Sequence, residues 1–250
     1  IRFIVQSKDF QVEVKSGLVG AYNVSNCLAA LTATVYGLGI KPEVAAQGIT
    51  SLEEIPGRME RIDMGQNFTA IVDFAHTPNA LKSALEAARD LTPNPSPERR
   101  GERSRVICVF GSAGLRDKEK RRMMAETSAE LADLTVLTAE DPRTESLDGI
   151  LDEMAAGARS RGRTEGETFW RVPDRGKAIR FALKLAREGD IVMACGKGHE
   201  QSMCFGEREH LWDDRIAMRA ALSEFLGVEG PQMPYLPTQD TEESEWLTWK

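Results

Sequence analysis

The sequence predicts an α/β fold in which a mostly parallel sheet carries helices on both faces. From about residue 57 onward, short runs rich in valine and isoleucine alternate with longer amphipathic segments. Buried strands that alternate with helices in this way form parallel sheets joined by helical crossovers. Glycine-rich and charged segments directly follow the predicted strands, at the edge where an open parallel sheet binds its ligands.

Five strands and five helices are expected in this larger region. The strands are the short apolar runs "FTAIVDF", "RVICVFG", "LTVLTA", "TFWRV" and "DIVMACG". The helices are expected where apolar residues recur with helical spacing, at 77–91, 118–132, 147–160, 176–188 and 213–226. Thr77 is expected to cap the first of these helices, with Pro78 in its first turn.

The first 56 residues predict a smaller unit of different character. Polar and apolar residues alternate over 1–15, which predicts an antiparallel hairpin. Asn23 is expected to cap a helix that runs to about Tyr36, and a second short helix is expected to begin near Pro42. Because so short a segment buries too little surface to fold alone, we expect 1–56 to be the end of a larger domain whose beginning is absent.

Two segments lack a regular pattern. Residues 91–104, "LTPNPSPERRGERS", combine prolines with charges and predict a solvated insertion between a helix and a strand. Residues 228–250 are rich in proline and acidic side chains and predict a disordered tail. The expected organisation is therefore a remnant at 1–56, a main domain at 57–227 and a tail.

Composition argues against several classes of function. The formal net charge is −7, which disfavours nucleic-acid binding, and no apolar run approaches the ~18 residues of a membrane span. We therefore expect neither a nucleic-acid nor a membrane partner. Four widely spaced cysteines predict reduced thiols and a cytoplasmic location. Cys195, His199 and Cys204 do not have the spacing of a zinc site.

Four polar segments follow four of the predicted strands. They are "DFAHTP" (73–78), "GSAGLRDKEKR" (111–121), "AEDPR" (139–143) and "GKGHE" (196–200). The carboxyl ends of parallel strands meet at one edge of a sheet, so we expect these segments to border a single crevice. Their shared position carries more weight than any one motif.

The side chains of this crevice suit a zwitterionic ligand. Arg116 and Lys118 suit a carboxylate or a phosphate, and Arg143 adds a second planar guanidinium group. Asp141 and Glu200 suit an ammonium group. Arg116 together with Glu200 would therefore bind the two ends of an amino acid.

Asp73 and His76 suit a ribose, or a polyphosphate with its Mg²⁺. The sequence contains no G-x-x-x-x-G-K-[ST] phosphate loop, so this chain is expected to supply only one wall of a nucleotide triphosphate site. Structural roles stay open for these residues. Asp73 and His76 would then be helix caps, Arg143 would pair at the surface with Glu140 or Glu145, and the glycines of "GKGHE" would only end a strand.

Seven motifs occur in an order and spacing that resemble a known family. They are "GAYNVSNCLAAL", "PGRMERI", "DFAHTPNAL", "FGSAGLRDKEKRRMM", "AEDPRTES", "DRGKAI" and "GKGHE". Over roughly residues 15–227 the chain resembles the Mur ligases, closest to their diamino-acid-adding, tripeptide synthetase branch. The resemblance implies a three-domain enzyme in which 1–56 ends the central ATPase domain and 57–227 is a Rossmann-like carboxyl-terminal domain.

The resemblance also implies an ATP-dependent ligation in peptidoglycan biosynthesis. ATP with Mg²⁺ would convert the carboxylate of UDP-N-acetylmuramoyl-L-Ala-D-Glu into an acyl phosphate, and the amine of meso-diaminopimelate or L-lysine would displace the phosphate. The family's phosphate loop and its magnesium-binding lysine are missing from this sequence, so the catalytic residues are unknown. We expect the chain to be inactive alone, either as a fragment of the enzyme or as one half of a split protein whose P-loop domain is a separate chain.

Position by position, the resemblance assigns two groups of ligand-binding residues. The expected ATP-binding group is Asn23 and Asn26 near the adenine, Arg58, Asp73 at the ribose, and His76 on the phosphate side, where it would meet the metal through ATP–Mg²⁺. The expected amino-acid-binding group is Arg116, Asp141, Arg143, Gly196 and Glu200.

Departures from the family pattern bear on the substrate. Diaminopimelate-adding members usually read D-N-P-R, whereas this chain reads "EDPR". Arg143 favours a ligand with a second carboxylate, while Asp141 in place of asparagine favours lysine or a relaxed choice. Leu115 replaces an acidic residue of the family. Two alternatives stay open: a non-catalytic module that binds an amino acid or nucleotide, and a ligase similar to folylpolyglutamate synthetase.

Overall fold

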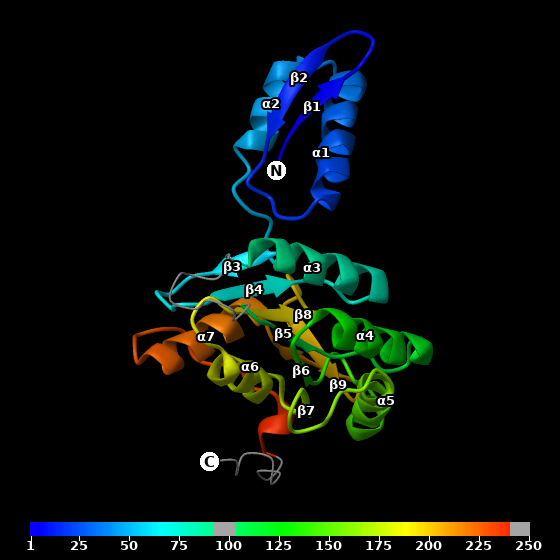
Figure 1. The fold of residues 1–250 in the computed structure, drawn as a ribbon, viewed down its shortest axis with the longest axis vertical. Helices are drawn as coiled ribbons and strands as arrows, with labels where there is room; N and C mark the ends of the chain where they lie inside the picture. The colour runs from blue at the N-terminus through cyan, green and yellow to red at the C-terminus, as the bar shows by residue number, and fades with distance from the viewer. Residues whose placement is uncertain (93–103, 241–250) are drawn as a thin grey trace.

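The computed structural model describes residues 1–92 and 104–240, arranged as a small N-terminal unit above a larger α/β domain (Figure 1). Most of the insertion expected at 91–104 therefore lies outside the described residues, as do residues 241–250 of the expected tail. No helix in the described ranges is both long enough and apolar enough to cross a membrane.

The N-terminal unit consists of a hairpin packed against two helices. Strand β1 (Arg2–Gln6) pairs antiparallel with β2 (Gln11–Lys15), and helix α2 spans Pro42–Thr50 with its proline in the first turn, so both predictions are confirmed. Helix α1 spans Tyr22–Thr32 and continues as a π-helical segment, Ala33–Gly37. Val5, Val14, Leu31, Ala45 and Ala46 form the small core of this unit.

The prediction that Asn23 caps α1 is wrong. The N-cap is Ala21, two residues earlier, and no side chain caps the helix. Asn23 is buried inside the first turn, where its Nδ2 donates to the carbonyl oxygen of Val19 (2.6 Å).

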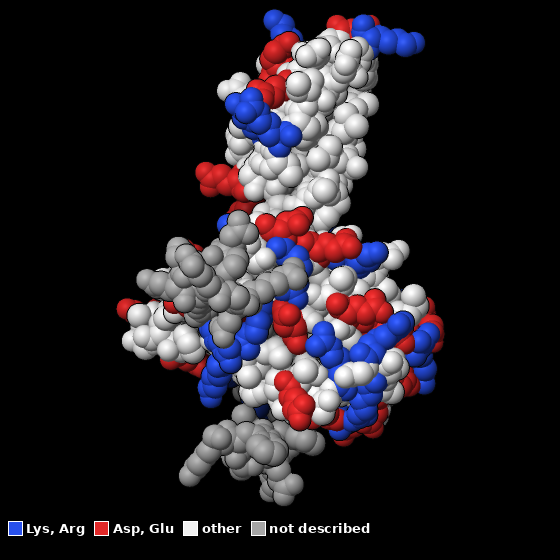
Figure 2. All heavy atoms as spheres, viewed as in Figure 1, with Lys and Arg blue, Asp and Glu red and all other residues white. Residues whose placement is uncertain are grey.

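One side of the N-terminal unit carries almost no charge. No charged residue occurs between Tyr22 and Gly37, and the exposed side chains there include Leu28 and Tyr36. Figure 2 shows this uncharged face, which contrasts with the charged surface of the larger domain. Exposed apolar side chains in an uncharged surface are typical of a region that packs against another protein surface.

The larger domain is built on a six-stranded sheet in the order β3-β4-β8-β5-β6-β7. The strands are β3 (Glu60–Ile62), β4 (Thr69–Asp73), β8 (Ile191–Cys195), β5 (Val106–Phe110), β6 (Leu134–Leu137) and β7 (Phe169–Arg171). All neighbours pair in parallel except β3, which is antiparallel to β4. The five predicted strands are confirmed, whereas the short edge strand β3 was not predicted.

Helices cover both faces of this sheet, as predicted (Figure 1). On one face lie α3 (Pro78–Leu91), α4 (Lys118–Leu131) and α5 (Leu147–Ser160), which contribute Leu81, Met124 and Met154 to the core. On the other lie α6 (Arg175–Leu185) and α7 (Asp214–Leu226). Thr77 caps α3 by accepting a hydrogen bond from the amide of Ala80, with Pro78 at the first helical position.

Two further parts of the chain differ from expectation. Strands β9 (Ser202–Phe205) and β10 (Arg208–Leu211) form an antiparallel hairpin beyond β8 that was not predicted. The prediction of a disordered tail from residue 228 is wrong for residues 228–240. Leu236 is completely buried, a 3₁₀ turn follows at Pro237–Asp240, and Thr238 donates to Asp174 at 2.7 Å, so apolar burial anchors this stretch.

Candidate functional site

The polar segments gather at one edge of the sheet, as the sequence predicted. β4, β8, β5 and β6 are consecutive neighbours. Asp73 ends β4, Gly196 follows β8, Gly111 follows β5, and Glu140 comes shortly after β6. Two cavities open at this edge, and together they receive every residue that the sequence placed in the ATP-binding and amino-acid-binding groups.

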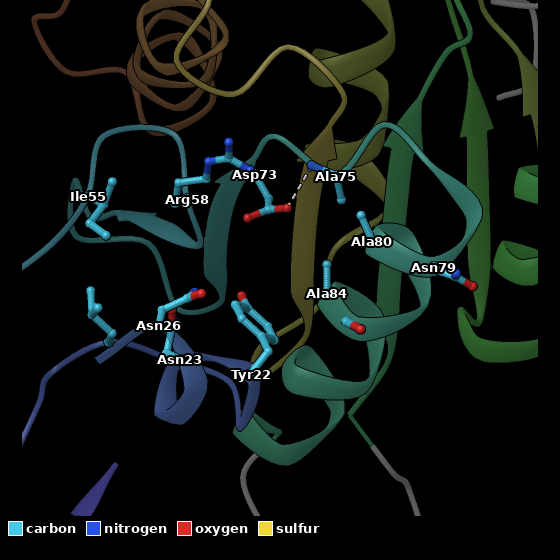
Figure 3. A pocket seen from close by; sticks show the side chains of 12 residues that line it. Tyr22, Asn23, Asn26, Ile55, Arg58, Asp73, Ala75, Asn79, Ala80 and Ala84 are labelled. Atoms are coloured by element: carbon cyan, nitrogen blue, oxygen red, sulfur yellow. Dashed lines mark hydrogen bonds between the residues drawn. The ribbon is translucent and has the colours of Figure 1, made fainter. Parts of the chain in front are cut away.

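The first cavity has a volume of about 610 Å³ and lies between the N-terminal unit and the larger domain (Figure 3). Four of the five residues expected to bind ATP line it: Asn23, Asn26, Arg58 and Asp73. Sequence reasoning missed Tyr22, Asn79 and Ser83, which also line this cavity. Burial, reinforced by the charge of Asp73, raises the pKa of Tyr22 to about 12, so its phenol stays protonated at neutral pH.

The polar groups of the first cavity are held by internal hydrogen bonds. Asn26 Nδ2 donates to Asn23 Oδ1 (2.9 Å). Asp73 is buried, and its two carboxylate oxygens accept from the amides of Met59 and Ala75, both at 2.8 Å. Burial raises the pKa of Asp73, although these backbone hydrogen bonds oppose the shift. Asp73 therefore ties β4 to the linker that precedes β3 and does not cap α3.

The second cavity, about 400 Å³, contains all five residues expected to bind the amino acid. Arg116, Asp141, Arg143, Gly196 and Glu200 line it, together with Phe74, His76, Thr77, Ala113, Asp117, Lys120 and Glu140. His76 thus lies here and not in the first cavity, and its Nδ1 is 2.9 Å from the carbonyl oxygen of Phe74. It is not a helix cap, because Thr77 fills that role.

A single extended segment separates the two cavities. Asp73 and Ala75 line the first, whereas Phe74 and His76 line the second. The segment leaves the end of β4 at Asp73, and the amide of Ala75 donates to Asp73 Oδ1 (2.8 Å), which holds Ala75 on the side of the first cavity. Arg58 also reaches this divide, since its guanidinium lies 4.4 Å from the centre of the Phe74 ring.

Arg143 is held in place by the unpredicted β9–β10 hairpin. Its amide donates to Cys204 O (3.1 Å), and its carbonyl oxygen accepts from the amide of Gly206 (2.7 Å). Its Nε is buried and has no hydrogen-bond partner among the described residues. The structural alternative, a surface pair with Glu140 or Glu145, is wrong, because Glu145 binds Arg121 at 2.7 Å, which lowers the pKa of Glu145 to about 2.

Asp141 and Glu200 both form an ion pair with the ammonium group of Lys197, a residue of the protein itself. Lys197 Nζ lies 3.0 Å from Asp141 Oδ2 and 2.8 Å from Glu200 Oε2. Asp141 Oδ1 also accepts from the amide of Cys204 (2.8 Å). Sequence reasoning missed Lys197; its place between two glycines next to Glu200 was the available signal.

Glu140 is a further residue that the sequence did not place in the site. Burial raises the pKa of its carboxyl group to about 7, although the charge of Arg175 opposes the shift. Its Oε2 is buried without a hydrogen-bond partner in the described part of the chain. A side chain at Gly196, where φ is +113°, would place a Cβ only 2.3 Å from that oxygen, so this position requires glycine.

The "GKGHE" turn also contacts the linker between the two units. A Cβ added at Gly57, where φ is +64°, would lie 2.2 Å from the backbone of Gly198 and His199. The His199 and His76 rings flank Phe74, with ring centres at 4.8 and 4.5 Å. Within residues 1–92 and 104–240, no group of three or more histidine, cysteine, aspartate or glutamate side chains is arranged to hold a metal ion.

Known proteins resemble this chain over most of its length. A UDP-N-acetylmuramyl-tripeptide synthetase from Roseiflexus sp. (strain RS-1) is 43% identical over 92% of this chain and 43% of its own length. A UDP-N-acetylmuramoyl-L-alanyl-D-glutamate--2,6-diaminopimelate ligase from Solibacter usitatus is 41% identical over 90% of this chain and 42% of its own length. The chain thus spans about two fifths of the length of these relatives.

A solved structure of a UDP-N-acetylmuramoyl-L-alanyl-D-glutamate--2,6-diaminopimelate ligase shares the fold. It superposes with a TM-score of 0.60 and 31% identity, over 90% of this chain and 43% of that one. The model of the glutamate ligase domain of Mur ligases matches residues 57–198, which include the segment Asp73–His76 between the two cavities. The chain therefore belongs to the Mur ligase family.

Proposed function

We propose that this chain forms the amino-acid-binding part of an ATP-dependent ligase that adds a diamino acid to UDP-N-acetylmuramoyl-L-Ala-D-Glu in peptidoglycan synthesis. One observation carries the proposal. Two oppositely charged sets of side chains, suited to the ends of an amino acid, line one cavity, and a second cavity with nucleotide-binding features adjoins it across a single extended segment. Ligases of this class need a nucleotide and an amine side by side.

The first cavity would hold ATP. Its volume of about 610 Å³ suits a nucleoside, the amides of Asn23 and Asn26 offer donors and acceptors to a base, and Arg58 offers a positive charge to phosphate. The protein's part in holding Mg²⁺ would be small in this chain, because its described residues contain no cluster of three potential ligands. His76, which lines the second cavity, would face the phosphate side of the nucleotide from there.

The second cavity would hold the diamino acid. Arg116 and Arg143 would bind carboxylates, Glu200 and Asp141 would bind the distal ammonium group, and the Gly196 backbone would contact the ligand closely. In the reaction, the γ-phosphoryl group of ATP passes to the peptide carboxylate, giving an acyl phosphate and ADP. The deprotonated amine then forms the amide bond as phosphate leaves.

The phosphoryl-transfer residues would come from a P-loop domain. This sequence contains no phosphate loop, and the N-terminal unit exposes an uncharged face on α1 against which such a domain would pack. In this proposal residues 1–56 belong with that central domain, and the main domain begins at 57.

The test is a combined assay of phosphate release and product mass. The chain is incubated alone, and with a separately expressed P-loop domain, in the presence of ATP, Mg²⁺, the UDP-linked dipeptide and either meso-diaminopimelate or L-lysine. We expect product only in the mixture. Amino-acid binding without product in any combination would support the alternative of a non-catalytic binding module, and the absence of both would overturn the proposal.

A further inference from the structure

Lys197 lies behind the second cavity and is almost completely buried. Its side chain is 2% exposed, compared with 41% for Glu200 and 18% for Asp141. Burial lowers the pKa of Lys197, but its hydrogen bond to Glu200 and the charge of Asp141 more than offset this, so the pKa is raised and the ammonium group stays charged. Lys197 does not itself line the cavity, so it acts on a ligand only through these two carboxylates.

The carboxylates and Lys197 together leave room for one ligand ammonium group. Two negative charges and one positive charge give a cluster with one net negative charge. Asp141 is further occupied on Oδ1 by the amide of Cys204, which fixes its orientation toward Lys197. The net charge of the cluster is therefore balanced when one distal ammonium group of a ligand binds.

The second cavity contains more positively charged side chains than a single ligand carboxylate would neutralise. Arg116, Lys120 and Arg143 line it, and no carboxylate among residues 1–92 and 104–240 forms an ion pair with any of them. Arg143 Nε is buried and lacks a hydrogen-bond partner there. Lysine, with one carboxylate, would leave Arg143 desolvated and unpaired, which is costly, whereas a diamino dicarboxylic acid would pair it.

We propose that Lys197 is a specificity-determining positioning residue: by neutralising one of the two carboxylates, it prevents Asp141 from turning this cavity into a site for lysine. The inference rests on the proposed function, in which the second cavity binds the diamino acid. In the "EDPR" motif, Arg143 favours a ligand with two carboxylates and Asp141 favours lysine. The pairing of Asp141 with Lys197 decides between them in favour of meso-diaminopimelate. The extra negative charge of Asp141 is balanced inside the protein, so it does not compete with the carboxylates of the ligand.

The test measures the ratio of affinities for meso-diaminopimelate and L-lysine by ligand-observed NMR on the folded chain. Lys197→Met leaves two unbalanced carboxylates, and we expect the ratio to shift toward lysine by roughly tenfold. In Lys197→Met with Asp141→Asn, the net charge of the cluster returns to one negative, and the ratio should return to within about twofold of the original. Lys197→Arg keeps the charge and should keep the preference.

A ratio is informative because a purely structural defect weakens both ligands together. Lys184→Met, which removes an exposed lysine of α6, is the matched control and should leave the ratio unchanged. If Lys197→Met does not fold, Lys197→Gln, which also removes the charge but keeps a polar end, replaces it and should shift the ratio toward lysine in the same way. An unchanged ratio in Lys197→Met, or a failure of the double variant to restore it, overturns the role of Lys197. No binding of either amino acid to the unchanged chain overturns the proposed function itself.

Discussion

The two cavities differ in how their polar groups are satisfied. In the first, Asp73 accepts two backbone hydrogen bonds and Asn23 accepts one from Asn26. In the second, Glu140 Oε2 and Arg143 Nε are buried without partners among the described residues. Since buried polar atoms are nearly always paired, unpaired ones mark places that ligand or solvent atoms fill. The hydrogen bonds of the first cavity are therefore already formed within the protein. In the second cavity, atoms of a ligand or of solvent would supply the missing hydrogen bonds.

The largest expected effect comes from the contact on which both cavities depend. Gly57→Ala would drive a Cβ into the backbone of Gly198 and should lower the free energy of unfolding by about 4 kcal/mol in urea titrations. Gly39→Ala is the matched control. It has nearly the same φ, +68° against +64°, but nothing lies within 4 Å of the added Cβ, so it should cost only about 1 kcal/mol. Equal losses would show that the close approach is unimportant.

Arg143→Ala should affect only the second cavity. We expect the affinity for meso-diaminopimelate to fall by about a hundredfold and that for lysine to change by less than about threefold, because only the former has a second carboxylate to pair with this guanidinium. Arg116→Ala provides the comparison and should weaken both amino acids alike. Parallel losses in Arg143→Ala would refute its assignment to the distal carboxylate.

Glu140 gives the second cavity a pH-dependent stability. Its pKa in the folded protein, about 7, is raised above the ordinary glutamate value of 4.5, so the fold favours the protonated form. The stability it contributes is greatest below pH 4.5 and is lost as the pH rises through 7, by about 2.5 kcal/mol between pH 5 and 8. Glu140→Gln should remove this component from unfolding curves recorded across that range, and an unaltered pH dependence would argue against it.

The smallest effect is expected in the first cavity. Asn26→Ala removes a neutral hydrogen bond to Asn23 and an exposed amide, and should weaken ATP binding by roughly fivefold in a calorimetric titration. The affinity for the amino acid should not change, because Asn26 does not line the second cavity. A loss in both sites would mean that the dividing segment couples them more strongly than its hydrogen bonds suggest.

The sequence predicted the features that depend on local pattern. The apolar runs located five strands, and the topology of a parallel sheet was enough to bring Arg116, Asp141, Arg143, Gly196 and Glu200 into one cavity. It could not predict the pairing of Lys197 with Asp141, because the two lie 56 residues apart and meet only through folding. The β9–β10 hairpin was missed for another reason. Its strands are four residues each, only β9 has buried residues and β10 is largely exposed, so neither has the continuous apolar run of the sheet strands.

The contact between Gly57 and Gly198 constrains the linker between the two units. Residues 51–59 connect α2 to β3, and their backbone is pressed directly against the "GKGHE" turn. The linker is therefore packed against the turn that carries Gly196 and Glu200 of the second cavity, and it is not a flexible tether. One residue inserted next to Gly57 would displace the backbone that packs against the "GKGHE" turn. The same insertion beside Gly65, where nothing lies within 4 Å of an added Cβ, would leave both cavities unchanged.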